Sequence, residues 1–446
     1  MEAATAAPPE APTAAAPAHP PRVPLPRVLQ TARFAVRPIA FFEHWRRQLG
    51  ETFEARLFGP GKIVFLSDPE SIRALFAADR VNTIAPGREI VLRPLLGQKS
   101  LLLQKDEEHL ARRRLMLPPF HGERMRAYER TIVEATERAI SSWPRGEAFA
   151  IHPSMQAITL EVIVRAVFGI EDPVRRARLS EALVAVVNEA ASPAALGLVA
   201  PLVRDLPHYR RFRRLVERAD AMLAEEIGER RRDPDLAERQ DILSMLVAAE
   251  FEDGSKMDDR ELRDQLYTLL LAGHETTATG LAWTFDLLLH RPDAYELLVA
   301  EVDSGDGAYL DAVIEESLRV RPVVPFTGRE LREPATLGGY DHEPGAVVMA
   351  GIYLAHTRDD VYRDPYAFRP ERFLGESRPE TYSWIPFGGG TRRCIGAAFA
   401  QMEMRVAIET IVRSVELRAA SAEPERPVRR NVTTSPRHGT RVIVIH

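Results

Sequence analysis

Residues 387–396 of this 446-residue chain have the sequence FGGGTRRCIG, and a run with helical periodicity follows from Ala397 to Val415. Glycines allow a tight loop with positive φ angles and bare amides. Cys394, the only cysteine, lies just before the N-terminus of the predicted helix. The unpaired N–H groups and the dipole at that place stabilise a thiolate, and nearby arginines act in the same direction. The stretch predicts a thiolate held in a loop.

Several chemistries are compatible with one such cysteine. A thiolate in a loop is a soft axial ligand for haem iron. The pattern also fits an inert buried cysteine, or the nucleophile of a cysteine hydrolase whose histidine partner comes from a distant segment. A single thiol cannot form an internal disulfide or a multi-cysteine zinc or iron–sulfur site, so those classes are excluded.

The stretch from Asp258 to Arg291 is the longest one with helical periodicity. Asp258 and Glu261 form a predicted capping pair at its start. Its apolar part contains only two formally charged residues, Glu275 and Asp286, so we expect a buried helix that crosses the whole domain. A membrane span is the competing interpretation, but the polar centre and the lack of a second span oppose it. No transmembrane anchor is expected.

The centre of this predicted helix, residues 272–277, has the sequence AGHETT. Glycine and threonine are poor interior helix residues, and a carboxylate in a core is costly unless it is partnered. A threonine hydroxyl can bond the carbonyl four residues earlier and open the helix locally. We therefore expect a polar notch that could hold small molecules or water. The alternative is a kinked helix in which the buried Glu275 carboxylate has hydrogen-bond partners within the protein. A zinc-protease helix is excluded because Ala278 stands where its second histidine is needed.

The rest of the chain predicts a mainly α fold with small β-sheets (α+β). Amphipathic helices are predicted at 123–143, 153–168, 176–192, 208–232 and 396–415, with shorter ones beginning near residues 67 and 308. Strand patterns are few: a hairpin at 53–58 and 62–67, and a second strand pair at 336–340 and 346–352. Glu316 and Arg319 share one face of the helix from residue 308, and we expect an ion pair.

The amino-acid composition excludes some functions and indicates how the chain is divided into domains. With 45% hydrophobic and 28% charged residues the chain is globular, and a net charge of -5 does not supply the field that nucleic-acid binding needs. The Ala/Pro-rich start is neither a signal peptide nor an anchor. We expect a mobile tail over residues 1–30 and one compact domain over 31–446, in a cytoplasmic protein.

Five residues of the cysteine loop match every fixed position of the haem-binding signature of the cytochrome P-450 family, FxxGxRxCxG. They are Phe387, Gly390, Arg392, Cys394 and Gly396. The chain resembles this family in the order of its other motifs as well. These are HxxxR at His109–Arg113, the central helix motif at Ala272–Thr277, ExxR at Glu316–Arg319, and Pro370–Phe373, which supplies Arg372 as the second arginine. The resemblance covers about residues 35–446.

The resemblance implies haem b (iron protoporphyrin IX) between the long central helix and the cysteine loop. Cys394 is then the proximal metal ligand, whose electron donation favours O–O cleavage. Phe387, Gly388 and Gly396 surround the sulfur and tune the iron, and Ala272 lets the flat cofactor approach the helix. The implied partners of the two propionates are His109, Arg113, Arg329 and Arg392. The implied structural charge network is Glu316, Arg319 and Arg372.

On the other side of the cofactor, the resemblance implies an acid–alcohol pair. Thr276 donates a hydrogen bond to iron-bound dioxygen, and Glu275 relays protons to it. Peroxide-dependent relatives commonly have arginine and proline in this notch, and this chain does not. We therefore expect a monooxygenase that uses O2 and two external electrons, and places one oxygen atom in the substrate. A haem-binding sensor or docking protein of the same fold, without turnover, is the alternative.

Electrons are expected from separate carriers, a ferredoxin or flavodoxin with an NAD(P)H reductase. A basic patch could receive such an acidic carrier: Arg112, Arg113, Arg114, Arg392, Arg393 and Arg405. The substrate is expected to be lipophilic, such as a fatty acid, terpenoid or polyketide-like compound. The predicted pocket residues are Leu269, Ala272, Val323, Val324 and Phe326, together with the segments 84–96 and 187–206.

Overall fold

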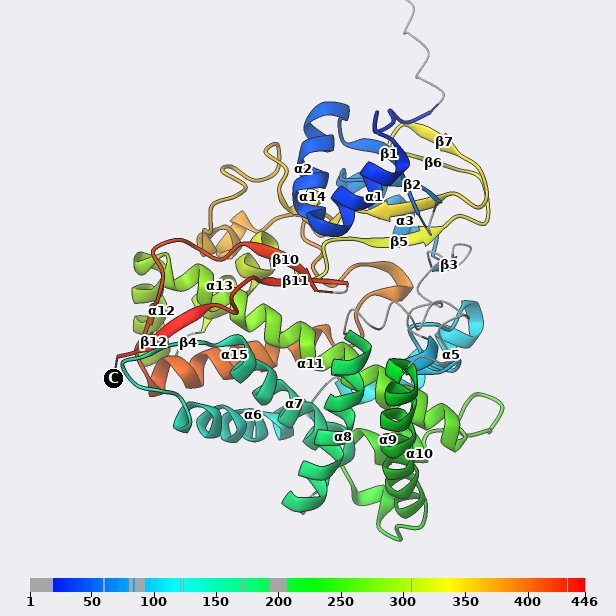
Figure 1. Cartoon of the computed structure of the whole chain (residues 1–446), viewed down its shortest axis with the longest axis vertical. Coiled ribbons are helices and arrows are strands. Elements are labelled where there is room, and N and C mark those ends of the chain that lie inside the picture. Colours follow the sequence, from blue (N-terminus) through cyan, green and yellow to red (C-terminus); the bar gives the residue numbers. More distant parts are fainter. Residues whose placement is uncertain are drawn as a thin grey trace, which may run out of the picture.

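The computed structural model describes residues 19–445, except 59–60, 80–82, 85–92, 121, 123, 171, 192–206, 306 and 431. Figure 1 shows a large helical body, with some of the short strands along it, beneath a smaller region that holds the first helices and the other strands. The long helix α11 (Asp259–Leu289) runs through the middle of the molecule. The predicted α+β class is confirmed.

The other long helices lie close to their predicted positions. They are α6 (Arg124–Ser141), α7 (His152–Phe168), α8 (Pro173–Ala191), α9 (Pro207–Arg231), α12 (Pro292–Ser304), α13 (Ala308–Val320) and α15 (Ala397–Ser414). The shorter ones are α1 (Arg27–Val36), α2 (Pro38–Leu49), α3 (Pro69–Ala77), α5 (Asp106–Met116), α10 (Ile242–Ala248) and α14 (Ile352–His356). The Asp258 carboxylate caps α11 by accepting the Glu261 N–H at 2.7 Å, as the sequence predicts.

The strands are short and form several small sheets. They are β1 (Thr52–Leu57), β2 (Gly61–Leu66), β3 (Thr83–Ile84), β4 (Ala148–Ala150), β5 (Thr327–Glu330), β6 (Ala335–Leu337), β7 (Tyr340–His342), β8 (Val347–Ala350), β9 (Leu417–Ala419), β10 (Pro427–Arg430), β11 (Thr433–Pro436) and β12 (Arg441–Val444). The largest sheet has the order β1-β2-β8-β5-β3, with β2 and β8 parallel. The predicted first hairpin forms as β1 and β2.

The second predicted strand pair is wrong in its pairing. β6 pairs with β7 around Gly338 and Gly339, whose φ angles of 63° and 79° suit a tight two-residue hairpin. β8 lies instead between β2 and β5, and all four of its residues are buried. A strand that is apolar on both faces belongs inside a sheet, so β8 joins the larger one.

The predicted end of the N-terminal tail is also wrong. Residues 1–18 lie outside the described part of the chain, but the fold begins well before residue 31. The Val23 N–H bonds the Glu54 carbonyl at 2.9 Å, and the Glu54 N–H bonds the Pro21 carbonyl at 2.8 Å. Gln30 is buried and donates to the Val23 and Leu25 carbonyls. Proline stops a helix but suits an extended edge segment, so this stretch packs along β1.

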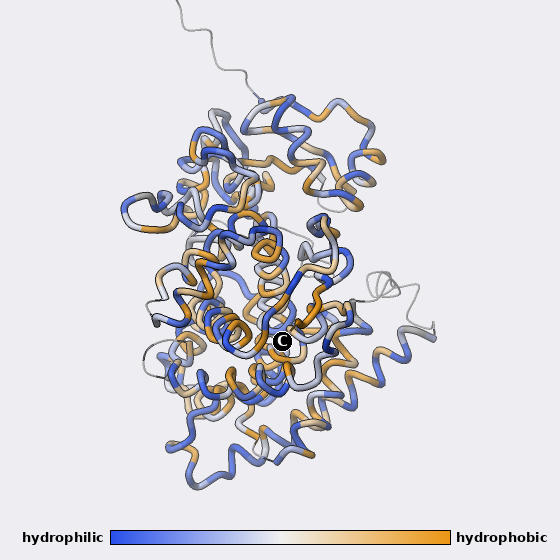
Figure 2. The backbone as a smooth tube through the Cα atoms, turned by 90° about the vertical axis from the view of Figure 1, so that its left-hand side faces the viewer, coloured by the Kyte–Doolittle hydropathy of each residue, from blue (hydrophilic) through white to orange (hydrophobic). Residues whose placement is uncertain are grey.

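Figure 2 shows hydrophilic and hydrophobic residues alternating along the outer helices, as amphipathic packing requires. Within the described residues, no single helix combines the length and the apolar character needed to cross a bilayer. Only the bent pair of His152–Phe168 and Pro173–Glu189, taken together, meets that test by length and composition.

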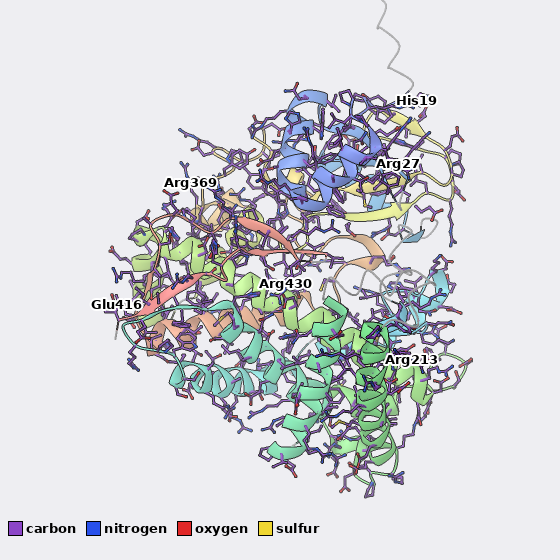
Figure 3. The ribbon with its side chains drawn as sticks, in the orientation of Figure 1. His19, Arg27, Arg213, Arg369, Glu416 and Arg430 are labelled. Atoms are coloured by element: carbon purple, nitrogen blue, oxygen red, sulfur yellow. The ribbon has the colours of Figure 1, made fainter. Side chains whose placement is uncertain are left out.

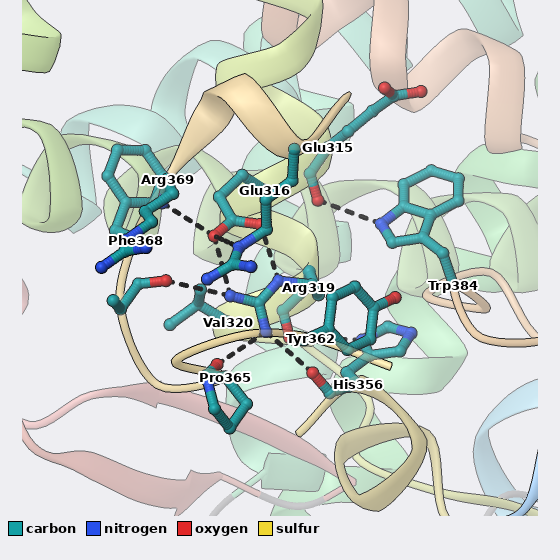
Figure 4. Close-up of polar contacts among 12 residues, drawn as sticks. Glu315, Glu316, Arg319, Val320, His356, Tyr362, Pro365, Phe368, Arg369 and Trp384 are labelled. Carbon is teal, nitrogen blue, oxygen red and sulfur yellow. Dashed lines mark hydrogen bonds and ion pairs between the residues drawn. The ribbon is translucent and has the colours of Figure 1, made fainter. Parts of the chain in front are cut away.

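A buried charge network joins α13 to the segment that leads to the cysteine loop (Figure 4). Arg319 and Glu316, both without exposed surface, form a two-pronged ion pair at 2.6 and 2.7 Å. The remaining Arg319 donors bond the carbonyls of His356, Pro365 and Ala367. Arg372 approaches the same Glu316 carboxylate at 3.4 Å. One carboxylate is thus shared by two arginines, and backbone carbonyls accept the remaining Arg319 donors, which makes this junction rigid.

His356 links this charge network to the segment before the cysteine loop by two hydrogen bonds. Its Nδ1–H donates to the Arg319 carbonyl at 3.2 Å, and its Nε2 accepts the Ile385 N–H at 2.8 Å. The Ile385 carbonyl in turn accepts the N–H of Gly388 at 2.9 Å. Burial, helped by the Arg319 charge, lowers the pKa of His356 to about 3. The ring is therefore neutral at pH 7, as both bonds require.

We predict that Glu316→Gln destabilises the protein by about 3–5 kcal/mol, because it leaves the Arg319 charge buried without its counter-ion. The matched control is Glu217→Gln, which breaks the exposed pair of Glu217 with Arg213 at 2.9 Å and costs less than about 1 kcal/mol. Urea unfolding measures both. Equal costs for the two substitutions would contradict the prediction.

We predict that His356→Gln flattens the pH dependence of stability. The native pKa of about 3 lies below the ordinary 6.5, so the unfolded chain binds an extra proton between these values. Stability from the neutral ring is full above pH 6.5 and falls on acidification, by about 1.4 kcal/mol per pH unit. Glutamine keeps a donor and an acceptor but does not titrate. Urea unfolding from pH 7 to pH 5 shows the difference, and identical slopes in both proteins would refute it.

Candidate active site

The cysteine loop is a compact turn that needs its glycines. Gly388 and Gly390 both have φ of 67°, in the region that favours glycine. A Cβ on Gly389 would lie 2.2 Å from the ring of Phe76, so the loop also needs a glycine there to pack against α3. The Cys394 N–H closes the turn by bonding the Phe387 carbonyl at 2.9 Å. The sulfur is thereby fixed just before α15.

The Cys394 thiol is desolvated and yet accessible. Burial raises its pKa, against the opposing effects of the Gly396 N–H bonded to the sulfur and of the nearby Arg113 and Arg393. The side chain is nevertheless exposed. An added Cβ at Gly396 would meet no atom within 4 Å. A thiol that is surrounded by protein and still accessible faces open space inside the fold.

Cationic side chains border this thiol. Burial, followed by the charges of Arg392, Arg113 and Arg329, lowers the pKa of His109 to about 3. Burial also lowers the pKa of Arg113, which has the Cys394 sulfur as its one anionic neighbour among the described residues. Arg392 donates to the Gln104 carbonyl at 2.7 Å. A desolvated guanidinium such as that of Arg113, with so little negative charge around it, suits an anionic ligand.

Arg329 is placed differently from the other predicted propionate partners. Its guanidinium forms a two-pronged ion pair with Asp79, at 2.6 and 3.0 Å, and donates to the Gly389 carbonyl at 3.2 Å. Its charge is therefore already balanced. In this structure Arg329 ties β5 and the segment after α3 to the cysteine loop.

The threonine back-bond predicted in the central helix is present. The Thr276 hydroxyl donates to the Ala272 carbonyl at 2.6 Å, four residues earlier. Ala272 is exposed although it lies in the middle of a buried helix, so it faces the same kind of internal opening as Cys394. Such a back-bond weakens the local helix and leaves room for small polar ligands.

The Glu275 carboxylate turns toward α7 and β10, into contacts that the sequence did not predict. Gln156 of α7 donates to its Oε2 at 2.5 Å. Its Oε1 lies 3.5 Å from Nη1 of Arg430 and 3.9 Å from Nε2 of His152, and has no hydrogen-bond partner in the structure. These partners come from α7 and β10, far away in sequence, so no local pattern could have revealed them.

The helices α11 and α15 are in tight contact at Gly280 and Met404. Gly280 allows this approach, because a Cβ there would lie 3.3 Å from the Met404 side chain. Glu403 is fully buried and bonds Thr277, and burial raises its pKa well above the ordinary value. Ala272 precedes Gly280 on α11, Cys394 precedes Met404 and the start of α15, and both Ala272 and Cys394 are exposed. A flat ligand with a thiolate-binding centre and anionic edge groups fits this donor set.

The predicted pocket residues are mostly covered by protein. Leu269 and Val323 are buried, Val324 is half-buried, and Phe326 packs against Phe34 and Phe42 with ring centroids 5.6 Å apart in each case. Ala272 is the member that is open. Most of the two predicted contact segments, residues 85–92 and 192–206, lies outside the described residues.

The predicted basic patch needs one correction. Arg112 is buried and pairs with Glu261 at 2.6 Å, so it does not contribute a surface charge. Arg405 pairs with Asp311 at 2.7 Å, and Arg114 pairs with Glu252. An arginine three residues after His109 faces the core of the helix pair, because α5 packs against the start of α11 with that side. Arg393 remains exposed beside Cys394.

Comparison with known proteins agrees with this geometry. The family model described as Cytochrome P450 matches residues 17–442. The chain is 44% identical over 413 residues to a protein of Mycobacterium tuberculosis named cytochrome P450 135B1, covering 91% of this chain and 87% of that one. It is 40% identical over 438 residues to cytochrome P450 137 of the same species, covering 95% and 90%.

Among solved structures, the cyanobacterial CYP120A1 with retinoic acid bound superposes with a TM-score of 0.83 at 26% identity, covering 95% of this chain and 98% of that one. The family model spans nearly all of the described fold, and one relative shares 44% of its residues over 413 positions. The chain therefore belongs to the cytochrome P450 family of haem-thiolate monooxygenases.

Proposed function

We propose that the protein binds haem b through Cys394 and inserts one oxygen atom from O2 into a lipophilic small molecule. The observation that carries this proposal is the accessible, desolvated thiol of Cys394 beside the desolvated guanidinium of Arg113. When bound, a haem-thiolate supplies O2 activation and O–O cleavage. The accompanying reduction takes two electrons, and the second oxygen atom leaves as water.

The cofactor's carboxylates are proposed to lie among His109, Arg113 and Arg392. Two guanidinium groups supply the positive charge. His109 is neutral at pH 7, because its pKa is about 3, and so offers a hydrogen bond without a charge. Arg329 is proposed to act mainly through Asp79 and Gly389, by fixing the loop rather than by binding a carboxylate.

On the notch side, Thr276 and Glu275 are the proposed proton-transfer residues. The Thr276 hydroxyl is the polar group nearest the open Ala272 face, and its back-bond to Ala272 keeps the oxygen lone pairs directed to the opening. Glu275 is the adjacent carboxylate and contacts side chains that extend toward the surface. An acid next to an alcohol can pass protons inward one at a time.

The substrate is proposed to be a fatty acid, terpenoid or polyketide-like compound. The solved relative with retinoic acid bound supports an extended lipophilic ligand. The electron donor is proposed to be a ferredoxin or flavodoxin, docking near the exposed Arg393 on the cysteine side. A first panel of compounds consists of retinoic acid, dodecanoic acid and a sesquiterpene alcohol, and a shift of the ferric Soret band identifies the ones that bind.

We also propose that the chain from about residue 20 onward is one domain.

We predict that Cys394→Ser removes the thiolate signature from the absorption spectrum of the reduced, carbon-monoxide-bound protein, because serine offers no soft sulfur ligand. Ile395→Val is the control, since it keeps the sulfur and every backbone donor. A thiol reagent provides a second readout: it labels haem-free wild type and spares the holoprotein. An unchanged spectrum in Cys394→Ser would contradict the assignment of Cys394 as the iron ligand.

We predict that Thr276→Val diverts electrons from product to peroxide, because the hydroxyl that handles protons at the notch is lost. The proportion of NAD(P)H consumed that appears as product falls by about 10-fold or more. Thr284→Val is the matched control, because Thr284 makes the same back-bond, to the Gly280 carbonyl at 2.9 Å, in a closed part of α11. Similar losses in both variants would point to helix damage and contradict the assigned role.

A further inference from the structure

The hairpin of β10 and β11 lies between the first helix and the central helix. Strand β10 contacts α1 and strand β11 contacts α11, and Figure 1 shows the two strands between these helices. The Thr434 hydroxyl donates to the Pro322 carbonyl at 3.0 Å, and the Thr434 N–H to the Val323 carbonyl at 2.8 Å. Trp283 of α11 donates its indole N–H to the Thr434 carbonyl at 2.9 Å. The hairpin is thus attached to the segment 322–326, which carries predicted pocket residues.

Arg429 lies on the face of β10 that is directed to this segment. The register of the hairpin places Arg429 directly opposite Thr434. Side chains at opposite positions of an antiparallel pair lie on the same face of the sheet. The Thr434 side chain uses that face to bond the Pro322 carbonyl. The Arg429 side chain therefore leaves the hairpin on the side of the segment 322–326.

An aromatic surface begins at the Arg429 guanidinium. Its central carbon lies 5.7 Å from the ring centroid of Phe34 on α1. The Phe34 centroid lies 5.6 Å from that of Phe326 and 5.7 Å from that of Phe42. Phe326 is one of the predicted pocket residues, and it is half-buried. A positive charge therefore stands at one end of an apolar surface that extends through Phe34 to Phe326.

The Arg429 guanidinium is desolvated although the residue keeps accessible surface. Burial lowers the pKa of Arg429, and yet the residue is exposed. Cys394 shows the same combination, which is expected of a group that borders an opening enclosed by protein. A charge in such surroundings attracts an opposite charge more strongly than it would in bulk water.

Arg430, the next residue, faces the other way. Adjacent strand residues point to opposite faces of a sheet. Arg430 lies 3.5 Å from the Glu275 carboxylate, and its side chain is 44% exposed. Figure 3 shows Arg430 over the middle of the molecule, at the level of α11. Arg429 can therefore be substituted without removing a contact of the proposed proton-transfer residues.

We propose that Arg429 binds the carboxylate of an acidic lipophilic substrate, whose apolar part lies along Phe34 and Phe326. This inference rests on the proposed function and narrows its substrate to lipophilic carboxylic acids. A guanidinium matches a carboxylate with two parallel N–H donors, and it is weakly hydrated, which suits a desolvated site. The two aromatic rings remove the apolar part of the substrate from water. Arg429 is a specificity-determining residue, since it contacts the substrate away from the reacting atoms.

Matched pairs of ligands test the carboxylate directly. Dodecanoic acid is compared with 1-dodecanol, and retinoic acid with retinol, by isothermal titration calorimetry of the holoprotein at pH 7, where both acids are ionised. We expect at least one acid to bind about 10-fold or more tightly than its alcohol, because the alcohol lacks the charge-assisted hydrogen bonds. The pair that shows the difference distinguishes a fatty acid from a terpenoid acid. If neither acid binds more tightly than its alcohol, the inference is overturned.

Substitution of Arg429 should remove this preference. In Arg429→Gln we expect the affinity for the acid to fall about 10-fold or more and that for the alcohol to stay within about 2-fold. Arg429→Lys should keep part of the preference, because the charge remains and the two-pronged geometry is lost. Arg418→Gln is the matched control, since Arg418 is exposed on β9, in a different sheet. An unchanged preference in Arg429→Gln, or an equal loss in Arg418→Gln, contradicts the proposal.

A purely structural role of Arg429 gives a different result. The guanidinium lies over the Phe34 ring, so its removal also weakens the contact between β10 and α1. If Arg429→Gln weakened acid and alcohol binding equally, Arg429 would only hold the hairpin in place, and the proposal would be wrong. Thermal unfolding and the spectrum of the reduced, carbon-monoxide-bound protein check that each variant is folded and contains haem.

Turnover separates this inference from the proposed function. If wild type and Arg429→Gln convert a neutral compound equally well and neither protein prefers an acid, the proposed function stands and the inference fails. If no compound yields product with any electron donor, but the preference for an acid depends on Arg429, the proposed function fails and the assigned binding role stands.

Discussion

A guanidinium group with no exposed surface underlies the geometry of the whole site. Burying Arg319 is costly, and the cost is offset only while Glu316 and three backbone carbonyls stay in place. His356 continues this order, because it bonds Arg319 on one side and the chain before the cysteine loop on the other. A series of short polar contacts thus runs from the interior of α13 to the turn that positions Cys394.

The electrostatics of the cysteine loop explain why a positive partner belongs there. In the protein alone, burial raises the pKa of Cys394 even though a backbone N–H and two arginines favour its ionised form. A thiolate at this position becomes stable when a metal ion shares its charge, because coordination deprotonates a thiol outright. The desolvated Arg113 has the opposite need, for an anionic group, since it lacks a carboxylate partner within the described chain. Both are consistent with an anionic metal cofactor between them.

Thr276 and Glu275 are adjacent on the central helix but make different contacts. Ala272 and Thr276, four residues apart, share the face that borders the opening. Glu275 is one residue away, and its face packs against α7 and β10. A carboxylate on the packed face can be held by charges that never touch the opening.

Sequence alone determined the features whose cause is local. The cysteine loop, the Asp258 cap, the span of α11 and the Glu316–Arg319 pair all follow from residues within a few positions of one another, and the family signature lies in one ten-residue stretch. The tertiary structure decided which distant groups meet. Arg112 became a buried partner of Glu261, β8 entered the larger sheet, and Gln156 and Arg430 converged on Glu275. Such contacts depend on how whole helices and strands pack, and packing leaves no periodic pattern in the sequence around either partner.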